Sequence, residues 1–316
     1  MKPIAILYEH PEWFKPLFLS LDRLGAPYVA LHAADHVFDP DERDVPYGLV
    51  VNRMSPSAWM RGQREAIFHT LRYLEHLDEI GAPVLNGSTA FHYELSKAAQ
   101  YSLMARLGVR HPATRVLSRP GQVLSAAAGL RFPVLVKPNI GGSGAGIASF
   151  ATPEELDVAL GSGSISFGID HVGLLQEHVP AQGDAIVRIE ILDGRFLYAI
   201  RLLLTPGTFN LCPADYCDLP GMTDGVSGRG LPVESYDPPT EIVDQARRLV
   251  EAAGMDVGGV EYLVSARDGE AYFYDINALS NFVADAPTVI GFNPYDDLAE
   301  LIVARAGVVA SGASAA

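Results

Sequence analysis

The sequence predicts an α/β protein that begins with a parallel sheet and becomes α+β, with antiparallel strands, in its C-terminal part. Over roughly the first ninety residues, strand-like apolar runs alternate with helix-like runs, an order typical of parallel sheets. From Ala185 onward, paired apolar runs flank Asp193-Gly194 and Asp268-Gly269, dipeptides that favour tight hairpin turns. Between these regions, a glycine-rich stretch lies within its own short series of strands, which indicates a separate small lobe.

We expect an N-terminal α/β domain over residues 1–96. Gly25 and Gly81 each follow a helix-like run and end it. The expected strands are Pro3–Tyr8, Pro27–His32, Tyr47–Asn52 and Pro83–Leu85, and the expected helices are Glu12–Leu24 and Ala58–Ile80.

A central lobe is expected over residues 97–183, a C-terminal domain over 184–308 and a frayed tail over 309–316. A long polar loop, 205–232, interrupts the C-terminal domain, and loops of that length are usually functional or mobile. The expected helices from residue 89 onward are Thr89–Leu107, Pro153–Leu160, Pro239–Ala253 and Tyr295–Arg305. The expected strands are Thr114–Leu117, Pro133–Lys137, Gly146–Phe150, Gly173–His178, Ala185–Leu192, Arg195–Leu204, Gly259–Ser265 and Ala271–Ile276.

The composition is that of an ordinary globular protein, with 48% hydrophobic and 19% charged residues among 316. A net charge of −15 argues against nucleic acid as a partner, because such a surface needs basic patches. No apolar run is long enough to span a bilayer, and acidic residues interrupt the short apolar run at the N-terminus, so we expect neither a membrane partner nor a signal peptide. Two cysteines are too few for a disulfide framework, so we expect a cytoplasmic location.

The most informative stretch reads RFPVLVKPNIGGSGAGI, from Arg131 to Ile147. An apolar run ends in Lys137-Pro138, and a loop with four glycines around Ser143 follows. A lysine supplies a point charge and glycines let backbone N–H groups surround anionic oxygens, so the stretch is suited to phosphate. It is neither a Walker A loop nor a dinucleotide fingerprint. A glycine-rich surface hairpin is the alternative interpretation.

A second informative stretch reads YFYDINALSN, from Tyr272 to Asn281. Asp275 and Asn277 share one face of a strand, and Glu261 lies in the neighbouring strand across the expected hairpin. Two carboxylates and an amide form an all-oxygen ligand set of the kind that Mg²⁺ prefers. A solvated face is the alternative, but buried carboxylates need a partner or a metal, which favours a metal site.

In order and spacing, these motifs resemble the ATP-grasp superfamily of carboxylate–amine ligases, which includes glutathione synthetase, D-alanine–D-alanine ligase and ribosomal-protein glutamate ligases. The resemblance covers the chain from about Lys97, in ELSKAAQYSLMARLGVRHPAT, to Ala299. It implies ATP as a cofactor, with Mg²⁺ or Mn²⁺. The residues it assigns to the nucleotide are Lys97, Lys137, Gly141, Gly142, Ser143, Gly144 and, in and after the hinge LLQEHVP, Gln176, Glu177, Val179 and Asp184.

The resemblance also implies that Glu261, Asp275 and Asn277 bind the metal, with Asp275 in place of the more usual glutamate. It implies that Arg201, together with Lys137, acts at the γ-phosphate or an acyl-phosphate, and that Arg188 contacts a substrate carboxylate. A planar guanidinium suits a transferring phosphoryl group. Surface charge on an antiparallel sheet is the alternative for both arginines.

The expected substrates are a small carboxylate and an amine, one of them an amino acid or small peptide, joined with release of ADP and phosphate. A kinase or carboxylase on the same ATP site, and a nucleotide-binding regulatory protein without turnover, are the alternatives. Ser280 and Asn281 are candidates for a substrate carboxylate or for capping a turn, and His10 is a candidate substrate contact because it follows the first strand. Cys212 and Cys217 are interpreted as packing residues, with reactive thiols as the alternative. Similar enzymes are often homo-oligomers, but no interface is readable from the sequence.

Overall fold

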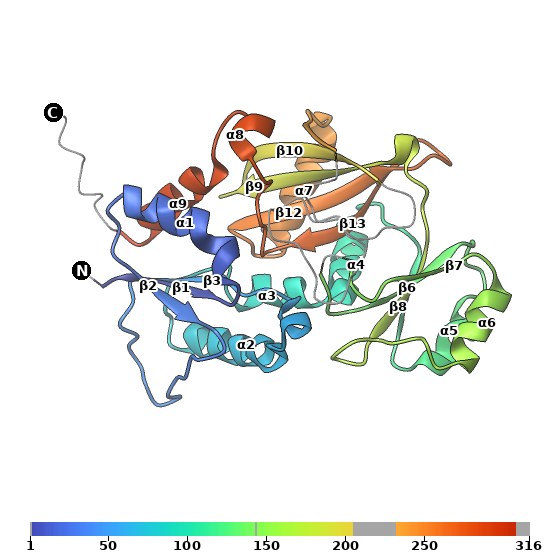
Figure 1. Cartoon of the computed structure of the whole chain (residues 1–316), viewed down its shortest axis with the longest axis horizontal. Coiled ribbons are helices and arrows are strands. Elements are labelled where there is room, and N and C mark those ends of the chain that lie inside the picture. Colours follow the sequence, from blue (N-terminus) through green and yellow to red (C-terminus); the bar gives the residue numbers. More distant parts are fainter. Residues whose placement is uncertain (1, 143, 205–231, 308–316) are drawn as a thin grey trace.

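A computed structural model describes residues 2–142, 144–204 and 232–307. The described part of the chain contains three sheets. A four-stranded parallel sheet lies at one end of the molecule and a four-stranded antiparallel sheet at the other, while a five-stranded antiparallel sheet lies beside both (Figure 1). This arrangement confirms the predicted α/β fold with a parallel N-terminal and an antiparallel C-terminal sheet.

The N-terminal sheet has the strand order β2-β1-β3-β4, with its strands parallel. One face packs against α1 and the other against α2, because apolar residues alternate between the two faces of β1 and β3. These elements are β1 (Ile4–Tyr8), α1 (Pro11–Arg23), β2 (Tyr28–His32), β3 (Leu49–Arg53), η1 (Ala58–Arg61), α2 (Arg64–Glu79), β4 (Val84–Leu85) and α3 (Ser88–Leu95).

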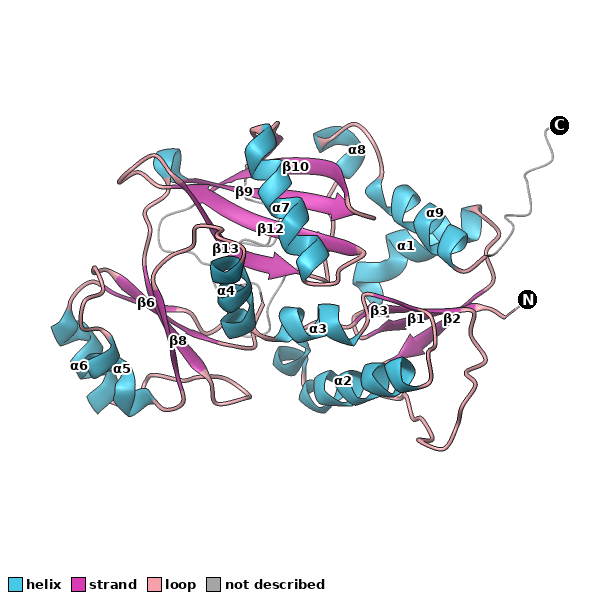
Figure 2. Ribbon diagram, turned by 180° about the vertical axis from the view of Figure 1, so that it is seen from behind, coloured by secondary structure: helices cyan, strands magenta, loops and turns pink. Residues whose placement is uncertain are grey.

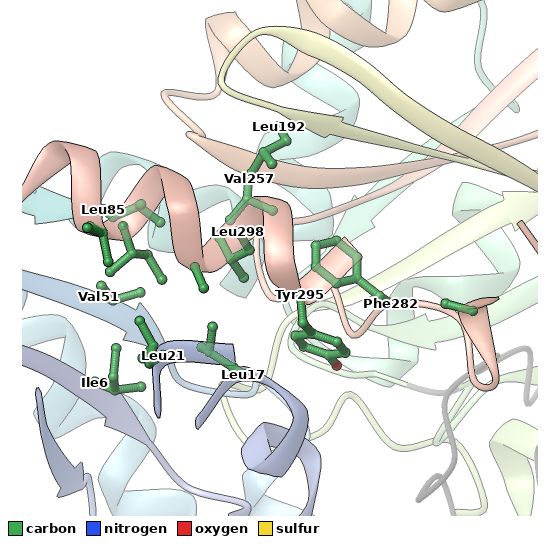
Figure 3. Packing of buried hydrophobic residues seen from close by; sticks show 14 of the residues in the cluster. Ile6, Leu17, Leu21, Val51, Leu85, Leu192, Val257, Phe282, Tyr295 and Leu298 are labelled. Atoms are coloured by element: carbon green, nitrogen blue, oxygen red, sulfur yellow. The ribbon is translucent and has the colours of Figure 1, made fainter. Parts of the chain in front are cut away.

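The C-terminal helix α9 (Pro294–Arg305) returns to the N-terminal sheet and packs beside α1 (Figure 2). Leu298 of α9 lies among Leu17, Leu21 and Val51 on one side and Val257 on the other, as Figure 3 shows. One hydrophobic core therefore joins the first and last thirds of the chain, and α9 packs between the N-terminal sheet and the large sheet.

The central lobe is an antiparallel sheet in the order β5-β8-β6-β7 with two short helices on one face. Its elements are β5 (Thr114–Leu117), η2 (Pro120–Gln122), α5 (Val123–Ala126), β6 (Val134–Pro138), β7 (Ala148–Phe150), α6 (Pro153–Gly161) and β8 (Gly173–Glu177). The glycine-rich loop joins β6 to β7, as expected for a hairpin of this lobe.

The large sheet has the order β11-β10-β9-β12-β13. One face is covered by α7 and by α4, whose buried side chains include Leu103 and Met104. Although we expected α4 to begin the central lobe, its apolar side chains therefore pack with the C-terminal sheet. The elements are α4 (Lys97–Arg106), η3 (Gln182–Asp184), β9 (Ala185–Leu192), β10 (Arg195–Leu203), β11 (Val233–Ser235), α7 (Thr240–Ala252), β12 (Val257–Val264), β13 (Ala271–Asn277) and α8 (Ala286–Val289).

Two expected helices are each divided in the structure. The run 58–80 breaks at Gly62, whose φ of 76° is left-handed, and the run 89–107 breaks at Ser96, where the backbone is extended. The Ser96 hydroxyl accepts a hydrogen bond from the N–H of Ala99 and so starts a new helix at Lys97. None of the described helices is long and apolar enough to cross a membrane. The loop 205–231 and the tail 308–316, with Cys212 and Cys217, lie outside the described residues.

Candidate active site

A cavity of about 650 Å³ lies where the three sheets meet. Residues of the N-terminal domain, the glycine-rich loop, the segment after β8 and the face of the large sheet opposite α4 and α7 line it. The predicted site residues among its lining are Lys97, Lys137, Gly141, Gly142, Gly144, Gln176, Glu177, Val179, Asp184, Arg188, Glu261, Asp275, Asn277 and Asn281.

The strand register of the large sheet places the residues of the site in two rows. Arg188, Glu261 and Asp275 are direct neighbours across β9, β12 and β13. The next row on the same face consists of Glu190, Gly259 and Asn277. The helices cover the opposite face, so both rows face the cavity side of the sheet. The expected cluster of Glu261, Asp275 and Asn277 is thus formed by strand pairing.

Lys97 reaches this cluster from the first turn of α4. Its Nζ donates a hydrogen bond to Oδ1 of Asp275, and both side chains are largely buried. Burial acts to lower the pKa of Lys97, but the nearby carboxylate of Asp275 outweighs it and raises the pKa. The side chain of Lys97 is therefore positively charged beside the metal-ligand candidates.

Lys137 lies at the end of β6, next to the glycine-rich loop, and a hydrogen bond holds its ammonium group. Its Nζ donates to the hydroxyl of Tyr101 at 2.8 Å, and that hydroxyl donates to the carbonyl of Tyr274 at 2.9 Å. Burial, with repulsion from Lys97, lowers the pKa of Lys137 to about 7. Two buried cations near each other form a site that favours an anion such as phosphate.

On the acidic side of the cavity, nearby positive charges do not balance the buried carboxylates. Burial and the neighbouring carboxylate of Asp275 raise the pKa of Glu261 to about 7, although Arg188 acts in the opposite direction. Burial also raises the pKa of Glu94 to about 7. Glu94 accepts hydrogen bonds from the N–H groups of Ala278 and Leu279, which directly follow β13. A cation placed beside Glu261 would relieve this repulsion.

The donor set at this point fits a magnesium ion. Glu261 and Asp275 offer carboxylate oxygens and Asn277 offers an amide oxygen, and all three residues line the cavity. No group of three acidic, histidine or cysteine side chains suited to a metal occurs within the described ranges. Two carboxylates and one amide leave further coordination positions, which phosphate oxygens ordinarily fill around Mg²⁺.

The glycine-rich loop closes the cavity toward the N-terminal domain. A Cβ built on Gly142 would lie 3.2 Å from the Cβ of Ser57, so the loop approaches that domain as closely as a glycine allows. Ser55 and Ser57 line the cavity opposite the loop, and their hydroxyls lie 2.8 Å apart. Ser143 lies outside the described residues.

The segment expected to hold adenine lies at the other end of the cavity. Gln176, Glu177 and Val179 line it together with Asp184. The Glu177 carboxylate accepts the N–H of Arg131 at 2.8 Å and faces Arg267 at 3.7 Å. The hinge is thereby attached both to the central lobe and to the turn between β12 and β13.

Arg188 is the centre of a buried polar network. Its Nε donates to Glu190 at 2.6 Å, one Nη donates to Glu261 at 3.2 Å, and the other donates to the Ser280 hydroxyl at 2.9 Å. Gly259 makes room for it, since a Cβ there would lie 2.9 Å from an Nη atom of Arg188. Burial opposes the charge, but the carboxylates of Glu190 and Glu261 raise the pKa of Arg188 further above its ordinary value. Ser280 supports Arg188 from behind and does not itself line the cavity.

The structure places Arg201 outside the cavity, away from the site to which the resemblance assigns it. The turn at Asp193-Gly194 alone would pair Arg201 with Ile186, on the cavity face, but a β-bulge between Phe196 and Tyr198 shifts the register by one residue. Arg201 therefore pairs with Val187 on the helix-covered face. There it contacts Glu234 at 3.2 Å and lies 4.6 Å from the ring centre of Tyr236, outside the cavity lining.

His10 also lies outside the cavity lining. Its ring stacks on the ring of Trp13, with 4.5 Å between the two ring centres. Trp13, rather than His10, faces the cavity, and the guanidinium of Arg61 lies 4.8 Å from its ring. Sequence reasoning missed Trp13, Glu94 and Tyr101. Their types and spacings are those of ordinary helix residues, and only their position in the fold relates them to the site.

Comparisons with known proteins agree with this fold. The chain is 27% identical over 209 residues to a D-alanine–D-alanine ligase of Geobacter sulfurreducens, and the match covers 66% of this chain and 62% of that protein. It therefore spans less than two thirds of that relative. No family model matches the sequence.

Among solved structures, the ATP-grasp ligase PsnB in complex with a precursor variant, Mg and ADP aligns with a TM-score of 0.68 and 17% identity, over 97% of this chain and 99% of PsnB. A D-alanine–D-alanine ligase of Bacillus anthracis in complex with ATP aligns with a TM-score of 0.66 and 14% identity, over 97% of both chains. These likenesses confirm the fold that the sequence motifs indicated.

Proposed function

We propose that this chain, which has the ATP-grasp fold, is an ATP-dependent ligase that joins a carboxylate to an amine. The main observation that supports this proposal is that Lys97, Lys137, Glu261 and Asp275 line the same cavity. Two lysines suit phosphate oxygens, and two carboxylates suit the metal that accompanies them. The named activity of the D-alanine–D-alanine ligase to which this chain is similar supports an amino acid or small peptide as a substrate.

We place ATP along the cavity from the hinge to the acidic rows. Its base would lie against Gln176, Glu177 and Val179, its ribose near Asp184, and its phosphates between the two lysines and the glycine-rich loop. The backbone of that loop and the ammonium of Lys137 would neutralise phosphate oxygens. Glu261, Asp275 and Asn277 would hold Mg²⁺, which supplies charge neutralisation at the phosphates when it is bound.

The reaction follows from these placements. A substrate carboxylate oxygen attacks the γ-phosphorus, and the bond from that phosphorus to the bridging oxygen breaks, which yields an acyl-phosphate and ADP. An amine then attacks the acyl carbon, phosphate leaves, and the nitrogen loses a proton. Arg188 lies on the same face as the metal ligands, where its guanidinium would stabilise the developing negative oxygens. The loop and Trp13 would exclude water, which otherwise hydrolyses an acyl-phosphate.

The test is a screen for ADP release with amino acids, dipeptides and small carboxylic acids, offered singly and in pairs, with product masses measured. We expect ADP release that needs both an acid and an amine, and a product mass equal to their sum less water. Lys137→Met and Asp275→Ala should abolish it, whereas Lys15→Met, a lysine change at an exposed position, should not.

Two outcomes would contradict the proposal. A phosphorylated or carboxylated product without amide would favour the kinase or carboxylase alternative. Nucleotide binding without ADP release under any pair would favour a regulatory protein.

A further inference from the structure

The amide side chain of Asn139 joins the central lobe to the first turn of α4. Asn139 follows Lys137 by two positions, at the base of the glycine-rich loop, and is only 7% exposed. Its Oδ1 accepts the N–H of Ala98 at 2.9 Å and the hydroxyl of Ser96 at 3.2 Å, and its backbone carbonyl accepts the N–H of Lys97 at 3.4 Å. One residue of the lobe thus contacts the three residues at which α4 begins.

The other end of this amide is fixed within the central lobe. Its Nδ2 donates to Oδ2 of Asp170 at 2.7 Å, and the backbone N–H of Asn139 donates to the carbonyl of Val172 at 3.0 Å. The N–H of Val172 donates in turn to Oδ1 of Asp170 at 3.2 Å and holds that carboxylate in place. Because donors lie on one side of the amide and a carboxylate on the other, an asparagine satisfies both sides, whereas an aspartate would repel Asp170.

The helix α4 is fixed in turn to the strand that carries two of the metal-ligand candidates. The Gln100 side chain donates to the carbonyl of Ile276 at 2.7 Å and accepts the N–H of Ile276 at 3.1 Å. Ile276 lies between Asp275 and Asn277 in β13. Buried hydrogen bonds therefore set the position of α4 relative to this strand, and the side chain of Lys97, the first residue of α4, reaches Asp275.

The two lysines that we assign to phosphate lie on opposite sides of the contact between Asn139 and α4. Lys97 belongs to α4, whereas Lys137 belongs to β6 of the central lobe. Lys137 also donates to the Tyr101 hydroxyl on α4, but it does so with the ammonium group that we assign to phosphate. The bonds of Asn139 involve neither ammonium group, so they can hold the spacing of the lysines while both bind phosphate.

Apolar packing fixes the base of the glycine-rich loop as well. Ile140, the residue after Asn139, is buried in the core cluster of the N-terminal domain, and Ile169 packs against the same cluster. A Cβ on Gly168 would lie 2.8 Å from the Cβ of Pro138, so the two segments of the lobe that meet here touch directly. The loop therefore starts from a base that is held on three sides, by α4, by the N-terminal domain and by the lobe itself.

From these contacts we propose that Asn139 is a positioning residue for the polyphosphate of ATP, which holds Lys137 and the glycine-rich loop at the distance from Lys97 that phosphate oxygens require. Asn139 lies outside the cavity lining, so it acts through the first turn of α4 and through Asp170. The inference rests on the ATP site of the proposed function and does not depend on amide formation. Loss of Asn139 should therefore weaken binding of the phosphates and leave binding of the nucleoside unchanged.

The test compares a non-hydrolysable ATP analogue with adenosine, which lacks the groups that the lysines would bind. Dissociation constants are measured on the full chain with Mg²⁺, by calorimetry for the ATP analogue and by titration in nuclear magnetic resonance for adenosine. Asn139→Ala should weaken binding of the ATP analogue about tenfold or more and change the affinity for adenosine by less than about twofold. Asn293→Ala, which removes an asparagine that caps α9 outside the cavity lining, is the matched control and should change neither affinity.

An exchange of the two partners provides a second readout if the alanine variant does not fold. Asn139→Asp places two carboxylates against each other and should weaken binding of the ATP analogue as the alanine change does. Adding Asp170→Asn restores a donor opposite an acceptor and leaves carboxylate oxygens for the N–H groups of α4. The double variant should therefore recover most of the affinity for the ATP analogue.

Four outcomes would overturn the proposal. The ATP analogue does not bind the wild type, Asn139→Ala binds it as tightly as the wild type does, Asn139→Ala weakens the ATP analogue and adenosine equally, or the double variant binds the ATP analogue no better than Asn139→Asp. Equal weakening would make Asn139 a structural part of the lobe alone. Because these measurements require no turnover, binding of ATP that depends on Asn139 without any amide product would refute the ligase proposal and leave this inference standing.

Discussion

Lys97 and Asp275 form an ion pair although 178 positions separate them in the sequence. The pair joins the first turn of α4 to the end of β13, and both residues line the cavity. The lysine thus pairs with the carboxylate that we assign to the metal. We expect binding of ATP with its metal to exchange this contact, since we assign the lysine to phosphate and the carboxylate to Mg²⁺.

Lys97→Met should change the affinity for MgATP and the affinity for the metal alone in opposite directions. We expect MgATP to bind about tenfold more weakly or worse, because a phosphate-neutralising charge is lost. Mn²⁺ alone should bind more tightly than to the wild type, because Asp275 is released. Calorimetry for MgATP and paramagnetic resonance for Mn²⁺ measure the two affinities. Weaker Mn²⁺ binding in the variant would show that Asp275 is not a metal ligand.

Lys137 should take up a proton when ATP binds. Its pKa is about 7 in the structure, so at pH 8 much of it is uncharged, and polyphosphate beside it favours the ammonium. We expect proton uptake near pH 8 that diminishes toward pH 6, measured by calorimetry in buffers of different ionisation enthalpy. Glu94 and Glu261 also have pKa values of about 7, so the difference between wild type and Lys137→Met isolates the lysine. If the difference in proton uptake between wild type and Lys137→Met were the same at pH 6 and pH 8, the assignment of this proton uptake to Lys137 would be contradicted.

Tyr101→Phe should impair nucleotide binding without removing any charge. The hydroxyl accepts from Lys137 and donates to the Tyr274 carbonyl, and its loss leaves both groups unpaired inside the protein. We expect the free energy of unfolding to fall by about 1–3 kcal/mol and the KM for ATP to rise. Chemical denaturation and steady-state kinetics measure these. Tyr272→Phe, at an exposed hydroxyl that bonds Asp268, is the control.

Gly259→Ala should disturb Arg188 specifically. The added Cβ would lie 2.9 Å from an Nη of Arg188 and 3.0 Å from Glu190, and both groups are fixed by the buried network. We expect a loss of about 1–3 kcal/mol in stability and a decrease in kcat with little change in ATP affinity. Gly121→Ala, where a Cβ meets open space, is the matched control. Normal turnover in the alanine variant would exclude a role for Arg188 in the reaction.

His36 should make the fold sensitive to mild acid. Burial, with repulsion from His69 3.2 Å away, lowers the pKa of His36 from 6.5 to about 4. The unfolded chain therefore binds more protons between those values, so stability is full above pH 6.5 and declines as the pH falls toward 4. In His36→Phe this part of the decline, on the order of 1–2 kcal/mol after allowance for partial exposure, should disappear. Urea unfolding of both proteins at pH 7 and pH 4.5 tests the difference.

Local chemistry was sufficient to predict much of this protein. The alternation of strands and helices predicted the parallel sheet, and Lys137 with its glycines predicted the loop that closes the cavity. Asp275 and Asn277 are two residues apart in a strand, so their common face follows from the pleat alone. The turn at Asp268-Gly269 then made Glu261 their neighbour. In each of these cases, the information lies within one element or one hairpin.

What only the tertiary structure decided depends on register and on packing between distant elements. A single bulge turned Arg201 away from the cavity while Arg188 stayed in it, because one residue of slip reverses the face of every later side chain in a strand. Glu94 has the type and spacing of an ordinary helix residue. Its carboxylate accepts the N–H groups of Ala278 and Leu279, which lie 184 and 185 positions later in the chain, and it lines the cavity. Charge balance in a buried site is a property of the assembled fold, so no local pattern can reveal it.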